Sequence, residues 1–97
     1  MEFESKYRLI EHKKAIKFLK NQSADFRERV YKAYIEMLEN PFSNHNCIRL
    51  KGLRNIYRKK VGDFRIIYEV RDNELLIIVV DIDSRGQIYN RVNEIVK

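Results

Sequence analysis

The sequence predicts an α+β domain in which two N-terminal helices pack on one face of a small, mainly antiparallel β-sheet. Apolar residues recur at helical spacing in the first part of the chain, and from residue 56 onward the period changes to runs rich in β-branched and aromatic residues. The length of 97 residues suffices for one hydrophobic core, so we expect residues 1–97 to form a single domain. The expected order of elements is β-α-α-β-β-β.

The first two elements are short. Residues Tyr7 to Ile10 can form a strand at the start of the domain. Ala15, Ile16 and Leu19 then recur at helical spacing among lysines, which predicts an amphipathic helix of about three turns.

The second helix has clear start and stop signals. Ser23 is a good N-cap, and Asp25 suits the positive end of the helix dipole. Proline ends the helical pattern at Asn40-Pro41. The predicted buried face carries apolar side chains at Phe26, Val30, Ala33, Tyr34, Met37 and Leu38.

Three strands follow the helices. Residues 56–61, 64–70 and 75–82 are rich in β-branched and aromatic side chains. Gly62-Asp63 and Asp72-Asn73 supply the turn residues that a tight antiparallel meander needs.

The charge balance points to a polyanionic partner. Twenty Lys and Arg against 14 Asp and Glu give a formal net charge of +6, which attracts RNA, DNA, an anionic membrane or an acidic protein. A merely solubilising surface is the alternative. Cys47 is the single cysteine, so a disulfide framework and a cysteine-based zinc site are excluded. With no signal peptide or membrane span in view, we expect a soluble, cytoplasmic protein without membrane contact.

The positive charge is concentrated in one stretch. Strand alternation places Arg58 and Lys60 on one face and Tyr57 and Lys59 on the other, and it brings Arg65 beside the first pair across the hairpin. The cations of this stretch are Arg49, Lys51, Arg54, Arg58, Lys59, Lys60 and Arg65, against the single acid Asp63.

This pattern is typical of nucleic-acid binding, with Tyr57 and Tyr68 as aromatics that stack on bases. A solvated sheet face with ordinary strand tyrosines is the competing interpretation. On the first interpretation, the predicted RNA-binding residues are Lys51, Arg54, Arg58 and Lys59.

Other reactive side chains are given structural roles. Asp81 and Asp83 are two apart on a strand, but no further carboxylates converge on them, so we expect ion pairs with arginines and no metal. His12 and His45 are distant in sequence from the cationic strands, and Cys47 has no recognisable base partner. No cofactor is predicted.

Three motifs carry a resemblance to a known family. They are Leu50-Lys51-Gly52-Leu53, the hairpin Tyr57-Arg58-Lys59-Lys60-Val61-Gly62-Asp63-Phe64-Arg65-Ile66-Ile67-Tyr68-Glu69, and the ending Asp81-Ile82-Asp83-Ser84-Arg85-Gly86-Gln87-Ile88-Tyr89. In this order and spacing they resemble the RelE/ParE superfamily of toxins, over essentially the whole chain.

The resemblance implies catalytic roles at four positions. Lys60 matches a lysine proposed to act in deprotonation, and Arg65 matches an arginine that stabilises charge on the phosphate. Arg85 matches an arginine that protonates the leaving oxygen or binds the phosphate, and Tyr89 matches a tyrosine that orients the substrate. Two departures stand out: Arg58 replaces a second lysine of some members, and Ser84 replaces a frequent histidine.

Such residues can cleave RNA without a metal. Attack by a ribose 2′-oxygen builds negative charge on phosphorus, which fixed cations stabilise. Guanidinium groups of Arg58 and Arg65 match phosphate geometry, so Arg58 is expected to clamp the phosphate. Lys60, crowded by cations, is the better candidate for general base.

The resemblance therefore implies a toxin of a type II toxin-antitoxin system that cleaves messenger RNA on the ribosome. The implied partners are messenger RNA, ribosomal RNA and a RelB-like antitoxin in a hetero-oligomer, with an acidic segment covering the cations. The alternative within the superfamily is a ParE-like toxin that inhibits DNA gyrase without nuclease activity. An inactive basic adaptor that binds only protein is a third possibility.

Overall fold

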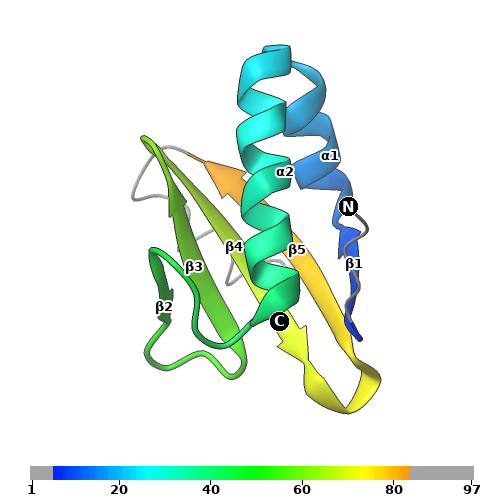
Figure 1. Cartoon of the computed structure of the whole chain (residues 1–97), viewed down its shortest axis with the longest axis vertical. Coiled ribbons are helices and arrows are strands. Elements are labelled where there is room, and N and C mark those ends of the chain that lie inside the picture. Colours follow the sequence, from blue (N-terminus) through cyan, green and yellow to red (C-terminus); the bar gives the residue numbers. More distant parts are fainter. Residues whose placement is uncertain (1–5, 84–97) are drawn as a thin grey trace.

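A computed structural model describes residues 6–83 of the chain, in which two helices cover one face of a five-stranded sheet (Figure 1). The strand order is β1-β5-β4-β3-β2; β1 runs parallel to β5, and the other neighbours are antiparallel. This confirms the predicted α+β fold. The elements are β1 (Arg8–Glu11), α1 (Lys13–Lys20), α2 (Ala24–Glu39), β2 (Cys47–Arg49), β3 (Ile56–Val61), β4 (Phe64–Arg71) and β5 (Leu76–Asp83).

The helices begin where side chains can cap them. The Ser23 hydroxyl accepts a hydrogen bond from the backbone N–H of Phe26 at 3.1 Å, as predicted for the start of α2. Helix α1 is shorter than expected, with eight residues and His12 as its N-cap. Ile16 is 41% exposed, so it does not belong to the buried face as its apolar character suggested. Within the described residues, no helix is long and apolar enough to cross a membrane.

The strands keep their predicted positions, and two features are additional. Strand β2 was not predicted, because its three residues form a strand only by pairing with β3, which comes later in the chain. Between β4 and β5 the pairing shifts by one residue: Tyr68 lies opposite Val79, whereas Ile67 lies opposite Asp81. This shift interrupts strict alternation along β5.

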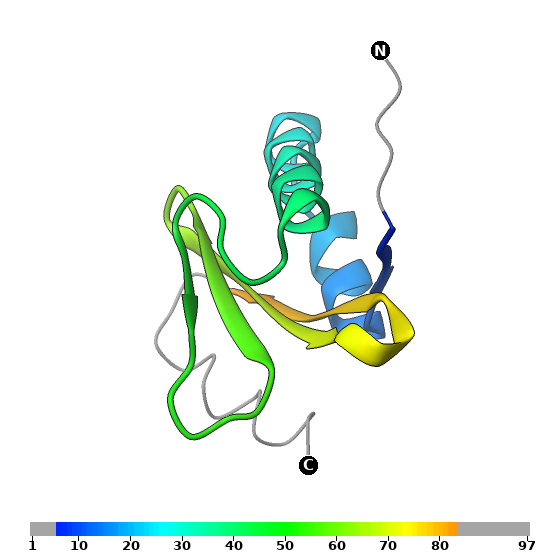
Figure 2. The ribbon, with the colours of Figure 1, turned by 60° about the horizontal axis from the view of Figure 1, so that its bottom comes forward.

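Apolar side chains fill both faces of the sheet. Both helices lie on the same side of it (Figure 2), which we call the helix face. The core on the helix face includes Val30 and Met37 from α2 and Tyr57, Ile66 and Tyr68 from the sheet. A second, smaller cluster on the opposite face consists of Leu50, Ile56, Ile67 and Val80, with Leu53 and Ile78 at its margin.

Candidate nucleic-acid interface

Three cations lie on the face of the sheet opposite the helices. Lys60 is directly opposite Arg65 in the β3–β4 pair, and Arg58 is opposite Ile67. Opposed residues of an antiparallel pair project to the same face, and Ile67 belongs to the second cluster. We call Arg58, Lys60 and Arg65 the cationic row. Their predicted convergence on one face is confirmed.

An acid lies at the inner end of this row. Asp83 of β5 is opposite Arg65 on the side away from Lys60, so Lys60, Arg65 and Asp83 cross three neighbouring strands in line. Lys60 is exposed, and the other two side chains are partly buried. Residues directly opposite each other on neighbouring strands have adjacent side chains, so a carboxylate stands next to Arg65, and Lys60 is at the more open end of the row.

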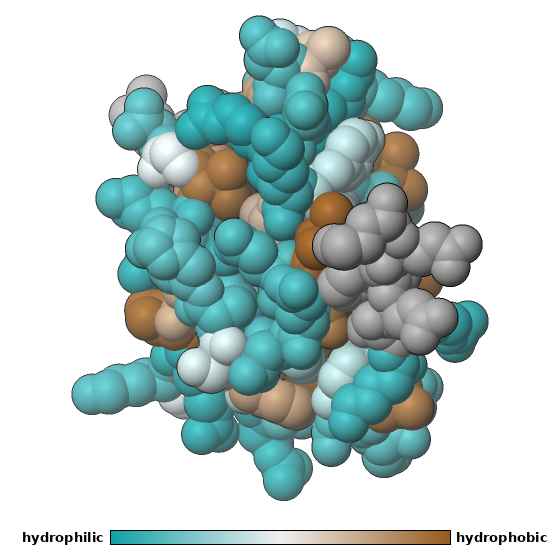
Figure 3. All heavy atoms as spheres, viewed as in Figure 1, coloured by the Kyte–Doolittle hydropathy of each residue, from teal (hydrophilic) through white to brown (hydrophobic). Residues whose placement is uncertain are grey.

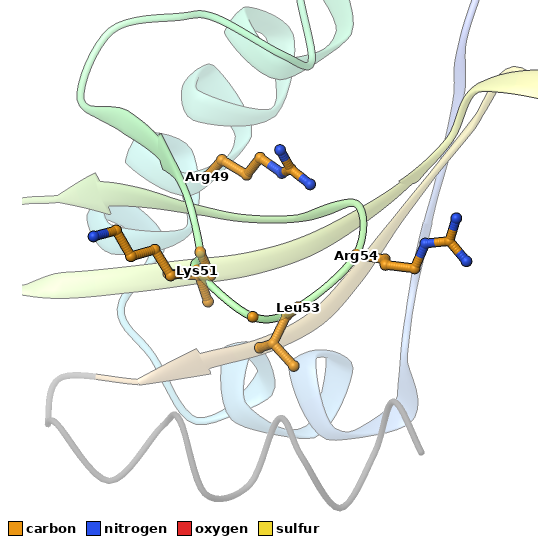
Figure 4. Close-up of a pocket in the computed structure, with 6 residues that line it drawn as sticks. Arg49, Lys51, Leu53 and Arg54 are labelled. Atoms are coloured by element: carbon orange, nitrogen blue, oxygen red, sulfur yellow. The ribbon is translucent and has the colours of Figure 1, made fainter.

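The loop between β2 and β3 brings further cations to the edge of the sheet. Residues 49–54, from the end of β2 through most of this loop, line a cavity of about 460 Å³. Leu50 and Leu53 attach the loop to the second cluster. In Figure 4, Arg49 and Arg54 extend toward one side and Lys51 toward the other. The loop cations therefore surround the cavity and do not converge on a single point.

Lys59 is not at the surface, where a residue that contacts RNA directly must lie. Its side chain is only 2% exposed and points to the helix face, between the partly buried Arg58 and the exposed Lys60. The ammonium group forms an ion pair with Glu36 of α2 at 2.6 Å and donates to Asn44 Oδ1 at 2.9 Å and to the backbone oxygen of His45. This corrects the prediction that Lys59 binds RNA: it connects α2, the following loop and β3.

The two tyrosines are also core residues. Tyr57 and Tyr68 stack on the helix face with ring centroids 5.6 Å apart, and both are buried. The Tyr68 hydroxyl donates to the backbone oxygen of Pro41 at 2.8 Å. Burial, followed by the hydrogen bond with Cys47, raises the pKa of Tyr68 above its usual range. The expectation that these rings stack on bases is therefore wrong, because the helices cover them.

The remaining reactive residues have local structural contacts. Nδ1 of His12 accepts from the N–H of Lys14 at 3.2 Å, and Sγ of Cys47 lies 3.0 Å from the Tyr68 hydroxyl. Asp81 is buried and accepts from the N–H of Ile82 at 2.8 Å. In the described part of the chain, no three His, Cys, Asp or Glu side chains gather as metal ligands.

Two predicted catalytic residues, Arg85 and Tyr89, lie outside the described residues, as does Ser84. The described part of the candidate site is therefore the cationic row with Asp83, together with the loop cations at Lys51 and Arg54. Only the one-residue shift along β5 brings Asp83 opposite Arg65, and strict alternation in the sequence gave no signal for that shift.

The family follows from a comparison of the sequence with known families. Residues 5–89 match the model of the ParE toxin of type II toxin-antitoxin systems. The chain belongs to this family of toxins. This toxin is 27% identical over 81 residues to the mRNA interferase toxin RelE of Escherichia coli (strain K12). The alignment covers 79% of this chain and 83% of that relative.

Solved structures agree with the fold of this toxin. The RelE–RelB complex from Pyrococcus horikoshii OT3 contains a chain with a TM-score of 0.74 and 26% identity, covering 84% of this toxin and 98% of that chain. A chain of the intact E. coli RelBE toxin-antitoxin complex matches with a TM-score of 0.72 and 26% identity. The match covers 82% of this toxin and 98% of that chain. The RelE/ParE superfamily assignment that the motifs predicted is thus confirmed.

Proposed function

We propose that this toxin is an endoribonuclease that cleaves messenger RNA on the ribosome. The observation that supports it most is the opposed pair Lys60 and Arg65 on the face away from the helices, with Arg58 two residues along. The similarity to a relative named mRNA interferase toxin favours the same activity. A toxin that acts on ribosomes would work in the cytoplasm.

In the proposed reaction, the ribose 2′-oxygen attacks the adjacent phosphorus and the bond to the 5′-oxygen breaks. Lys60 would accept the 2′-hydroxyl proton, and Arg65 and Arg58 would stabilise the negative charge on the phosphoryl oxygens. Arg85 would donate the proton to the leaving 5′-oxygen or bind the phosphate, and Tyr89 would orient the substrate. These steps require no metal ion or cofactor.

The proposal includes a partner. An antitoxin related to RelB would form a hetero-oligomer with this toxin, since two of the similar solved structures are complexes of RelE with RelB. An acidic segment of that antitoxin would cover the cationic row and neutralise it.

Single-residue variants in a ribosome assay test the nuclease. Purified toxin is incubated with ribosomes programmed with a message, and the new 5′ ends are mapped by primer extension. We expect Lys60→Ala to reduce the cleavage rate about 10²- to 10⁴-fold and Arg65→Ala about 10²- to 10³-fold. Lys32→Ala is the control, because Lys32 is exposed on α2 and pairs only weakly with Glu28, at 3.8 Å. Full activity of Lys60→Ala would exclude its role as the base.

The ParE name of the matched family supports a second candidate, a toxin that inhibits DNA gyrase without cutting RNA. The wild-type toxin is therefore also added to a gyrase supercoiling assay. Inhibition of supercoiling without any new 5′ end in the message would replace the nuclease proposal with this one.

A further inference from the structure

Helix α1 carries a row of lysines on its solvent side. The helix contains four lysines and no acidic residue in its eight positions. Lys13, Lys17 and Lys20 are spaced four and three apart, so they share one face, opposite the buried Ala15 and Leu19. All three are exposed. We call them the lysine row.

The charges of the lysine row are not compensated within the described residues. None of the three makes an ion pair there, whereas Lys32 pairs with Glu28 and Arg71 with Glu69. Lys13 even stands in the first turn, where the helix dipole disfavours a cation and where α1 has no acid. Lys17 and Lys20 stand in the last turn, where the helix dipole favours cations, so only Lys13 is placed at a cost to helix stability. A row of three exposed cations without an ion pair in the described part of the chain fits an external anion.

The chemistry of the row suits a phosphate backbone better than bases. Ammonium groups bind phosphates as point charges, whereas proteins that hold single strands stack bases on exposed aromatic rings. The aromatic residue of α1, Phe18, packs against Phe26 and Phe64 with ring centroids 6.1 and 5.7 Å away. It is thus engaged in the core. In the view of Figure 3, hydrophilic side chains dominate and apolar side chains form small separate patches, which disfavours an apolar docking groove there.

The lysine row and the cationic row lie at the same end of the molecule but on different faces of the sheet. Phe18 contacts Phe64, the neighbour of Arg65 in β4. Lys14 and Lys17 border a cavity of about 310 Å³ beside Asp81 and Ile82, near the end of β5. One RNA segment on each face can therefore be contacted at the same time.

We infer that the lysine row binds the phosphate backbone of double-helical RNA and thereby holds the toxin against structured RNA. The evidence for this binding is the geometry of α1. We further infer that the binding presents the cationic row to the RNA strand that is cut, and this part rests on the proposed function.

Binding to two RNA probes tests this inference. The triple variant Lys13→Gln, Lys17→Gln, Lys20→Gln is compared with Arg8→Gln, Lys32→Gln, Arg71→Gln, which loses the same charge at exposed positions elsewhere. Fluorescence anisotropy measures affinity for an RNA hairpin with a stem of about 16 base pairs and for a single strand of the same length, at several KCl concentrations. Thermal unfolding of each variant confirms that the fold is kept.

We expect the lysine-row variant to bind the hairpin about tenfold or more weakly, with the slope of log affinity against log salt reduced by about 2 to 3. Affinity for the single strand should change less than about twofold, and the control variant should bind both probes like wild type. An equal loss in the control variant would show an effect of net charge alone and overturn the inference. An equal loss for the single strand would overturn the assignment to duplex RNA.

A poly-glutamate peptide is the third probe. If the lysine-row variant keeps hairpin binding but loses the peptide, the row is a surface for an acidic protein and the inference is wrong. Cleavage is measured separately with Lys60→Ala. Retained cleavage by that variant would contradict the proposed nuclease mechanism while the hairpin result still decides the role of the lysine row.

Discussion

Three consecutive residues of β3 show how position decides what a cation does. Arg58, partly buried, and Lys60, exposed, project to the face opposite the helices, and Lys59 between them is buried under α2. The environment of Lys59 provides a carboxylate and two oxygen acceptors for its ammonium group. A buried charge with this many partners is part of the fold, because its desolvation is offset by ion pairing and hydrogen bonds.

Replacing Lys59 tests this structural role. We expect Lys59→Met to lower the free energy of unfolding by about 1 to 3 kcal/mol, because Asn44 and His45 lose a donor while the carboxylate of Glu36 remains solvated. The side chain of Glu36 is 45% exposed, which limits the cost of leaving it unpaired. Denaturant unfolding measures the change.

The matched control is Lys32→Met, which removes an ion pair whose two side chains are 74% and 68% exposed. It should change stability by less than about 0.5 kcal/mol. Equal stabilities of the two variants would contradict the role assigned to Lys59.

The hairpin of β3 and β4 is the element that determines the candidate site. Its two-residue turn at Gly62 and Asp63 fixes the register in which Lys60 faces Arg65. Gly62 has φ +60°, and a methyl group there would meet the guanidinium of Arg29 from α2. The turn thus requires glycine for its backbone conformation, and the helix covers it closely.

Alanine substitution at Gly52 and at Gly62, which both have positive φ, separates the cost of backbone strain from the cost of the contact with Arg29. Gly52 has φ +78° with nothing within 4 Å of an added Cβ, so Gly52→Ala should cost about 1 to 2 kcal/mol from backbone strain alone. Gly62→Ala should cost about the same, because the Arg29 side chain is exposed and can move aside. Thermal unfolding is the measurement. A much larger loss at Gly62 would mean that Arg29 is held firmly over the turn.

Helix α2 depends on its cap. Ser23→Ala removes the acceptor for the Phe26 N–H and should destabilise the toxin by about 1 kcal/mol. Ser43→Ala is the control, since Ser43 is exposed in the loop after α2 and contributes only its backbone N–H to the hydrogen bond with Asn40. If chemical denaturation finds both variants equally stable, the cap contributes nothing measurable.

At the scale of the whole molecule, side-chain hydrogen bonds join parts that are distant in sequence. The Tyr7 hydroxyl donates to Asp72, 65 positions along the chain, and so ties the start of β1 to the turn between β4 and β5. Tyr34 of α2 donates to Glu11 of β1 at 2.8 Å. These contacts attach the edge strand β1 both to the sheet and to the helices.

The first of these contacts predicts a pH dependence. The hydrogen bond to Asp72, aided by burial and by the negative charge of that carboxylate, raises the pKa of Tyr7 from 10.0 to about 12. A raised pKa in the folded state means that the stabilisation is complete below about pH 10 and is lost as the pH rises through about 12. Tyr7→Phe should therefore show a smaller decline in stability across this interval than wild type, in denaturant unfolding at a series of pH values. Tyr31→Phe, at an exposed position, should decline like wild type.

The sequence by itself determined both helices, every strand except β2, and the faces of the hairpin. Helical spacing and the Ser23 cap predicted α2, and period-two alternation predicted that Arg58, Lys60 and Arg65 share a face. These are local properties, since side-chain direction follows from neighbouring backbone geometry. The motif resemblance predicted the toxin family, which the family comparison confirmed. The roles of Arg85 and Tyr89 stay predictions.

Only the tertiary structure decided which cations are buried and which residues meet across strands. Lys59 is internal because Glu36, 23 positions earlier, comes over it when α2 packs on the sheet, and Tyr57 and Tyr68 are covered by the same packing. The strand β2 and the one-residue shift that brings Asp83 opposite Arg65 depend on pairing between separate strands. Pairing and burial of this kind arise from contacts between distant parts of the chain, which local patterns of residue type do not specify.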